Sequence, residues 1–156
     1  MSKYSLALID DEPDLREIIR DILAPLDLQF FEASDGRSPL SLIQSGMADA
    51  VLSDMHMGEF DGRKLLKELR SQGNNIPIVI LSGNADPSAV NEMLRLGCID
   101  YLIKPMNEQK LIDAVKMAVE FGSIQKQFEK KLEESNVELV KTWENLTRLR
   151  NGFAAV

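Results

Sequence analysis

The sequence has 156 residues, of which 44% are hydrophobic, a composition that fits one ordinary folded domain with some chain left over. No apolar run approaches the roughly 18 residues of a membrane span, and no secretory signal pattern follows Met1, so we expect a cytoplasmic protein outside the membrane. The net charge is −7, and residues 1–121 carry 12 Lys and Arg against 20 Asp and Glu, which disfavours direct DNA binding by this chain.

Five short apolar runs alternate with segments in which apolar residues recur at helical spacing. The runs are residues 6–9, 28–31, 50–52, 78–81 and 101–103, and the clearest helical spacing lies in residues 15–22, 65–69 and 90–94. Alternation of this kind is typical of a parallel sheet with right-handed crossovers. We therefore predict an α/β fold with a doubly wound, five-stranded parallel sheet.

From Asn107 onward the helical pattern continues beyond the point at which one compact domain should end. Apolar residues there recur every seven positions, as in a coiled coil, although Ser135 and Thr142 interrupt one of the two seam positions. The predicted seam consists of Phe128, Leu132, Leu139, Leu146, Leu149 and Phe153.

We therefore predict a domain of residues 1–121, whose fifth helix runs on into a coiled-coil extension of residues 122–156 with a joint at Gly122. The extension is expected to form a parallel homodimer. An alternative is that it folds back onto its own domain, and another is that it is a linker to an absent output domain.

Polar residues follow four of the predicted strands at the carboxyl ends, which is where doubly wound sheets bind ligands. They are Asp10, Asp11 and Glu12 after the first strand, Asp54 after the third, Ser82 after the fourth and Lys104 after the fifth. Neighbouring carboxylates repel one another unless a cation compensates them, and oxygen ligands open to water and phosphate suit Mg²⁺. The lysine and the serine remain available to hold a phosphoryl group that passes to a carboxylate oxygen.

These motifs resemble the receiver domain of two-component response regulators over roughly residues 1–121. The resemblance is carried by five elements in order: Asp10-Asp11, the stretch Asp54–Gly62, Ser82-Gly83, Tyr101 and Lys104-Pro105. It implies a flavodoxin-like receiver fold and a phosphorylation-activated response regulator.

The resemblance also implies a role for each matching residue. Asp54 corresponds to the phosphoacceptor, and the Mg²⁺ ligands correspond to Asp10, Asp11, Asp54 and the backbone carbonyl of His56. Lys104 corresponds to the lysine that pairs with the phosphoryl group, while Ser82 and Tyr101 correspond to the switch hydroxyl and the switch aromatic.

One position departs from the family pattern, because Gly58 stands where members usually carry proline four residues after the phosphoacceptor. His56 and Asn84 occupy positions that vary in the family and tune dephosphorylation, so the lifetime of the phosphorylated state is not predicted. Cys98 is expected to be a buried, inert thiol.

The expected function is a switch and not an enzyme. A histidine kinase or a phosphotransfer protein is expected to supply the phosphoryl group, and the fourth helix, fifth strand and fifth helix are expected to form the readout face. One alternative is a receiver fragment of a larger regulator with an enzymatic output domain. The other is an aspartyl-phosphate phosphatase, which is disfavoured because His56 stands where such enzymes need a second aspartate.

Overall fold

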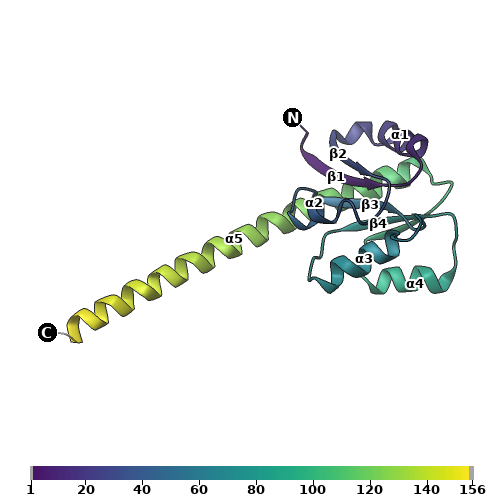
Figure 1. The fold of residues 1–156 in the computed structure, drawn as a ribbon. Coiled ribbons are helices and arrows are strands. Elements are labelled where there is room, and N and C mark those ends of the chain that lie inside the picture. The colour runs from purple at the N-terminus through teal and green to yellow at the C-terminus, as the bar shows by residue number, and fades with distance from the viewer. Residues whose placement is uncertain (1, 155–156) are drawn as a thin grey trace. The chain divides into compact units, whose positions relative to one another are not determined.

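The computed structural model describes the backbone of residues 2–154 and the side chains of residues 2–152. In these residues strands alternate with helices along the chain (Figure 1). The elements are β1 (Tyr4–Ile9), α1 (Pro13–Ile22), the short 3-10 helix η1 (Ala24–Leu26), β2 (Leu28–Ala33), α2 (Leu40–Gln44), β3 (Ala50–Asp54), α3 (Gly62–Ser71), β4 (Ile78–Ser82), α4 (Pro87–Arg95), β5 (Asp100–Ile103) and α5 (Glu108–Ala154). The chain divides into two compact units, Met1–Ser123 and Ile124–Val156.

All five strands of the first unit pair in parallel in the order β2-β1-β3-β4-β5. The fold predicted from the sequence is thus confirmed. The register places Ile9 beside Ser53, Asp54 beside Leu81, and Ser82 beside Ile103. The last residues of four strands therefore meet at one edge of the sheet, which is the edge that carries the predicted site.

Helices cover both faces of the sheet, and each face has its own apolar core. The two cores arise because successive side chains of a strand point to opposite faces. In β1, for example, Leu6 and Leu8 pack under α1 and α5, whereas Ala7 and Ile9 pack under α2, α3 and α4. Strands buried on both faces explain why the apolar runs are continuous in the sequence.

The starts of three helices are set by residues with a clear local role. Pro13 occupies the first turn of α1, where its missing N–H leaves no hydrogen bond unmade. Asp61 caps α3 by accepting a hydrogen bond from the backbone N–H of Lys64 at 3.1 Å. Asp86 accepts from the backbone N–H of Ser88 at 3.2 Å at the start of α4. These caps fix where each loop at the strand ends gives way to a helix.

Helix α5 continues through Gly122. The small size of this glycine serves close packing: a Cβ at Gly122 would overlap the carbonyl oxygen of Asp49 and lie 3.4 Å from Cδ of Pro77. Glycine is therefore required here for the approach of α5 to the start of β3, and the helix does not end at this residue.

The second unit consists of the C-terminal part of α5. Five residues of the predicted seam have exposed fractions between 49% and 65%: Phe128, Leu132, Leu139, Leu146 and Leu149. Phe153 lies outside the described side chains. Among the described residues, no helix combines the length and the apolar character that crossing a membrane requires.

Candidate functional site

Three carboxylates gather at the carboxyl edge of the sheet, as the sequence predicted. Asp10 and Asp11 follow β1 and Asp54 ends β3, and one carboxylate oxygen of each lies within 4.8 Å of the others. Asp10 and Asp54 are buried, whereas Asp11 is exposed. The site is therefore closed on the side of the sheet and open on the side of Asp11.

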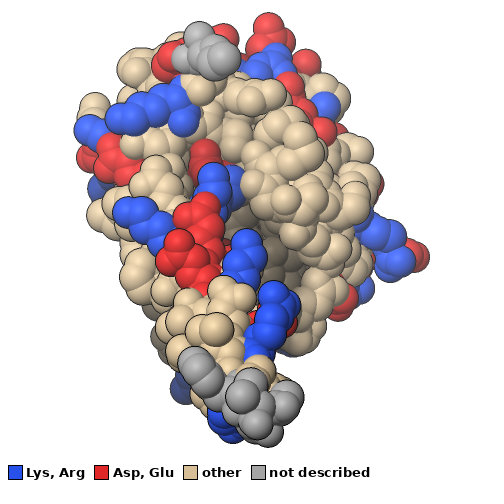
Figure 2. Space-filling model, turned by 90° about the vertical axis from the view of Figure 1, so that its left-hand side faces the viewer, with Lys and Arg blue, Asp and Glu red and all other residues tan. Residues whose placement is uncertain are grey.

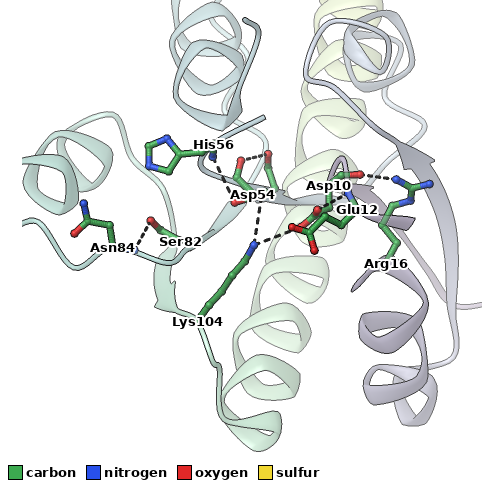
Figure 3. A network of polar contacts seen from close by, with 9 residues as sticks. Asp10, Glu12, Arg16, Asp54, His56, Ser82, Asn84 and Lys104 are labelled. Carbon is green, nitrogen blue, oxygen red and sulfur yellow. Dashed lines mark hydrogen bonds and ion pairs between the residues drawn. The ribbon is translucent and has the colours of Figure 1, made fainter. Parts of the chain in front are cut away.

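Lys104 supplies a positive charge to this cluster (Figure 3). Its Nζ lies 3.3 Å from Oδ2 of Asp54 and 3.6 Å from Oδ2 of Asp10. The 3.6 Å separation is an ion pair and not a hydrogen bond, so Oδ2 of Asp10 is buried with no hydrogen-bond partner. Burial is the main cause that raises the pKa of Asp10, opposed by the hydrogen bond from the Glu12 N–H.

The donor set fits a hard divalent cation. Three carboxylates face one ammonium group, and an orphaned carboxylate oxygen points to a missing positive partner. Carboxylate oxygens are the ligands that Mg²⁺ prefers, and the open side leaves room for water or phosphate. The predicted metal ligands Asp10, Asp11 and Asp54 are thus brought together.

Ser82 and Tyr101, the predicted switch residues, are linked through one residue. The buried Oγ of Ser82 accepts a hydrogen bond from the backbone N–H of Asn84 at 3.1 Å (Figure 3). The half-buried Tyr101 donates its hydroxyl to the carbonyl oxygen of Asn84, also at 3.1 Å. Two hydrogen bonds to the backbone of Asn84, one with Ser82 and one with Tyr101, therefore hold the loop after β4. A movement of the Ser82 hydroxyl can alter the position of Tyr101 through these two bonds.

The loop after Asp54 carries the predicted carbonyl ligand. The backbone N–H of His56 donates to Oδ1 of Asp54 at 3.4 Å, and its imidazole is exposed. Gly58 has φ of +64°, a left-handed conformation that glycine adopts readily and proline cannot. The backbone at this position therefore has a geometry that the family's proline could not adopt. The sequence predicted the glycine's departure from the family pattern but not this conformation.

Arg16 is a residue of the site's surroundings that sequence reasoning missed. Its guanidinium donates to the carbonyl oxygen of Asp10 at 2.5 Å and to Oε1 of Glu32 at 3.2 Å. It thus ties the acidic end of β1 to β2. A basic residue one helical turn after an acidic strand end is the only signal the sequence offered.

Cys98 takes no part in the site. It belongs to the buried core under α3 and α4, and burial raises its pKa to about 11. A protonated, buried thiol is unreactive, as expected.

The fold, the acidic cluster and the paired lysine define a class: a doubly wound domain whose strand ends carry three carboxylates that could hold a metal ion. Residues 6–116 match the family of the response regulator receiver domain, and the chain belongs to this family. Its acidic pocket and the Lys104 ion pair are consistent with response regulators that accept a phosphoryl group.

Three similar proteins illustrate the match. The regulatory protein AtoC of Escherichia coli is 35% identical over 125 residues, which is 78% of this chain and 26% of that protein. The regulatory protein DctD of Pseudomonas aeruginosa is 32% identical over 119 residues, 76% of this chain and 26% of that protein. The receiver domain of the Francisella response regulator 1452 is 30% identical with a TM-score of 0.70, covering 76% of this chain and 98% of that structure. The chain thus spans about a quarter of the two curated relatives.

Proposed function

We propose that the protein is a phosphorylation-operated switch and that Asp54 is its phosphoacceptor. The observation that carries the proposal is the position of Asp54: its carboxylate lies beside the acidic pair after β1 and 3.3 Å from the ammonium group of Lys104. A histidine kinase or a phosphotransfer protein would donate the phosphoryl group, since receiver domains are typically phosphorylated by histidine kinases.

The chemistry follows from this arrangement. An oxygen of the Asp54 carboxylate attacks phosphorus, a P–O bond forms, and the bond from phosphorus to the donor breaks with its electron pair leaving on the donor. Lys104 stands 3.3 Å from the same carboxylate and can neutralise a phosphoryl oxygen. Asp10, Asp11, Asp54 and the carbonyl of His56 would hold Mg²⁺, which when bound supplies positive charge to the phosphoryl oxygens.

The proposed output runs through Ser82 and Tyr101 to the face formed by α4, β5 and α5. A phosphoryl group that attracts the Ser82 hydroxyl would compete with the bond from Asn84, and that bond is one of the two that hold the loop. Each element of the face carries an exposed apolar side chain, namely Leu94, Ile103 and Met117, which supports a role in contacting a partner. A packed core converts such small shifts into discrete rearrangements.

We also propose that the tail makes a parallel homodimer. The support is the exposed apolar seam, from Phe128 to Leu149, which otherwise leaves large side chains in water. On the face shown in Figure 2, Lys and Arg lie among Asp and Glu, a mixture that does not favour DNA binding by that face.

Labelling with a small phosphodonor tests the proposed function. With Mg²⁺ and acetyl phosphate, intact-mass measurement should show one added phosphoryl group on the wild type and none on Asp54→Asn. Excess chelator should abolish the label. A fully labelled Asp54→Asn protein would remove Asp54 as the acceptor, and labelling that survives chelation would remove the metal.

A further inference from the structure

The loop between β3 and α3, residues 55–61, contacts the loop between β2 and α2 near its C-terminal end. The backbone N–H of Gly36 donates to the carbonyl oxygen of Phe60 at 2.9 Å. A Cβ at Gly36 would lie 2.8 Å from Cδ1 of Phe60 and 3.2 Å from the carbonyl oxygen of Asp61, so the two loops approach this closely only at a glycine.

Arg37, the next residue, lies over the aromatic ring of this loop. The central carbon of its guanidinium group is 5.1 Å from the centroid of Phe60, within the range of a cation–π contact. Arg37 is itself held, because Oδ1 of Asp35 accepts hydrogen bonds from the backbone N–H groups of Arg37 and Ser38, both at 2.8 Å. The turn at Asp35 thus fixes the backbone of Arg37, whose guanidinium group lies over the ring of Phe60.

The loop is weakly supported at Gly58. At Gly58 the chain lacks the rigid proline of the family, φ is +64°, and a Cβ placed there would meet nothing within 4 Å. Met57 anchors the inner half of the loop in the core, but Gly58 and Glu59 are exposed. The carbonyl oxygen of Glu59 accepts a hydrogen bond from Nζ of Lys64. Phe60 packs against the core with part of its ring and contacts Gly36 and Arg37 on the outside.

We infer that Arg37 is a positioning residue for the metal site. Its contact with Phe60 holds in place the loop that carries the His56 carbonyl, which is the proposed ligand of Mg²⁺. The inference rests on the proposed function in one respect, since it takes His56 as a metal ligand. Arg37 touches neither the metal nor the phosphoryl group, so its effect passes entirely through the loop.

The test compares Mg²⁺ affinity in the unphosphorylated full chain, measured by calorimetric titration. Arg37→Gln should weaken Mg²⁺ binding about two- to fivefold, the range expected when an exposed cation–π contact is lost. Arg37→Lys, which keeps a cation, should restore most of the affinity. The sign is diagnostic, because removing a positive charge near the site would by simple electrostatics tighten the binding of a cation.

Two further measurements make the test specific. Amide exchange in residues 56–60 should quicken about two- to fivefold in Arg37→Gln and stay at the wild-type rate in Arg95→Gln, which removes a positive charge from α4. In a Phe60→Leu background, Arg37→Gln should change neither the affinity nor the exchange rate further.

Unchanged or tighter Mg²⁺ binding in Arg37→Gln would overturn the inference. It would also be overturned if Arg37→Gln lowered the Mg²⁺ affinity as much in the Phe60→Leu background as in the wild type. A wild-type protein that binds no Mg²⁺ would instead contradict the proposed function, and the exchange rates alone would then decide whether Arg37 holds the loop.

Discussion

The ammonium nitrogen of Lys104 lies 3.3 Å from Oδ2 of Asp54, and among the described residues these two side chains form the ion pair that joins β5 to β3. The same nitrogen lies 3.6 Å from Oδ2 of Asp10. One cation thus serves two buried carboxylates, with a third carboxylate, Asp11, nearby. The site is electrostatically incomplete without a further cation, and this imbalance is the basis for its proposed chemistry.

Replacing Lys104 should expose this imbalance. Lys104→Gln leaves Asp10 and Asp54 without their cation, so we expect the free energy of unfolding in excess chelator to fall by about 1–3 kcal/mol, the usual cost of an unpaired buried polar group. Mg²⁺ should recover part of the loss. Urea unfolding measures both effects, with exposed Lys110→Gln as the matched control. Equal stability of the two variants would show that Lys104 does not stabilise the two buried carboxylates.

The close approach at Gly122 predicts opposite effects for two glycines in one helix. Alanine favours a helix by about 1 kcal/mol over glycine, so Gly152→Ala, where a Cβ meets nothing within 4 Å, should be neutral or stabilising. Gly122→Ala should instead destabilise the protein by about 1–3 kcal/mol, because its Cβ would overlap the Asp49 carbonyl. Thermal unfolding decides this, and a Gly122→Ala protein as stable as Gly152→Ala would show that α5 does not pack here.

Helix α4 is joined to α3 by a carboxylate that titrates. Oε1 of Glu92 lies 2.7 Å from Nη2 of Arg63 and 3.1 Å from Nζ of Lys67. Hydrogen bonds from Arg63 and then Lys67 lower the pKa of Glu92 below the usual 4.5. A carboxyl group with a lowered pKa contributes stability that is present above its unfolded value and is lost as pH falls through the folded value.

We therefore expect the amide protection of α4, relative to α3, to fall as pH drops below about 4.5. Glu92→Gln should show the reduced protection already at neutral pH and should lose this pH dependence. Glu68→Gln, on α3, serves as the control. Identical protection profiles for Glu92→Gln and the wild type would mean that these ion pairs do not hold α4.

The tail seam predicts different outcomes for two neighbouring apolar residues. Leu139 belongs to the seam, whereas Val137 lies on the side of the helix opposite the seam. Both side chains are more than half exposed. Each buried leucine contributes roughly 1.5–3 kcal/mol to association. Leu139→Glu should therefore shift the protein to monomer in sedimentation at tens of micromolar, while Val137→Glu should remain a dimer. A monomeric wild type would rule out the seam.

The sequence was sufficient to predict the sheet and the acidic site, for a simple reason. Continuous apolar runs report strands buried on both faces, and parallel strands bring their last residues, such as Asp54 and Ser82, to one edge whatever the details of packing.

Features that depend on contacts between distant segments were out of reach. The sequence gives no sign that Gly122 lies against Asp49 or that Arg37 lies over the ring of Phe60. The backbone at Gly58 is of the same kind, because glycine permits several conformations and only the folded loop selects φ of +64°.

Locating the phosphoryl group tests directly whether Asp54 is the phosphoacceptor. Borohydride reduction of the acetyl phosphate-treated protein converts a phosphorylated aspartate to homoserine, which tandem mass spectrometry of peptides assigns to one residue. We expect homoserine at residue 54, dependent on Mg²⁺, with Asp10 and Asp11 unmodified. Homoserine at residue 10 or 11, or reduction with no conversion at residue 54, would contradict this expectation.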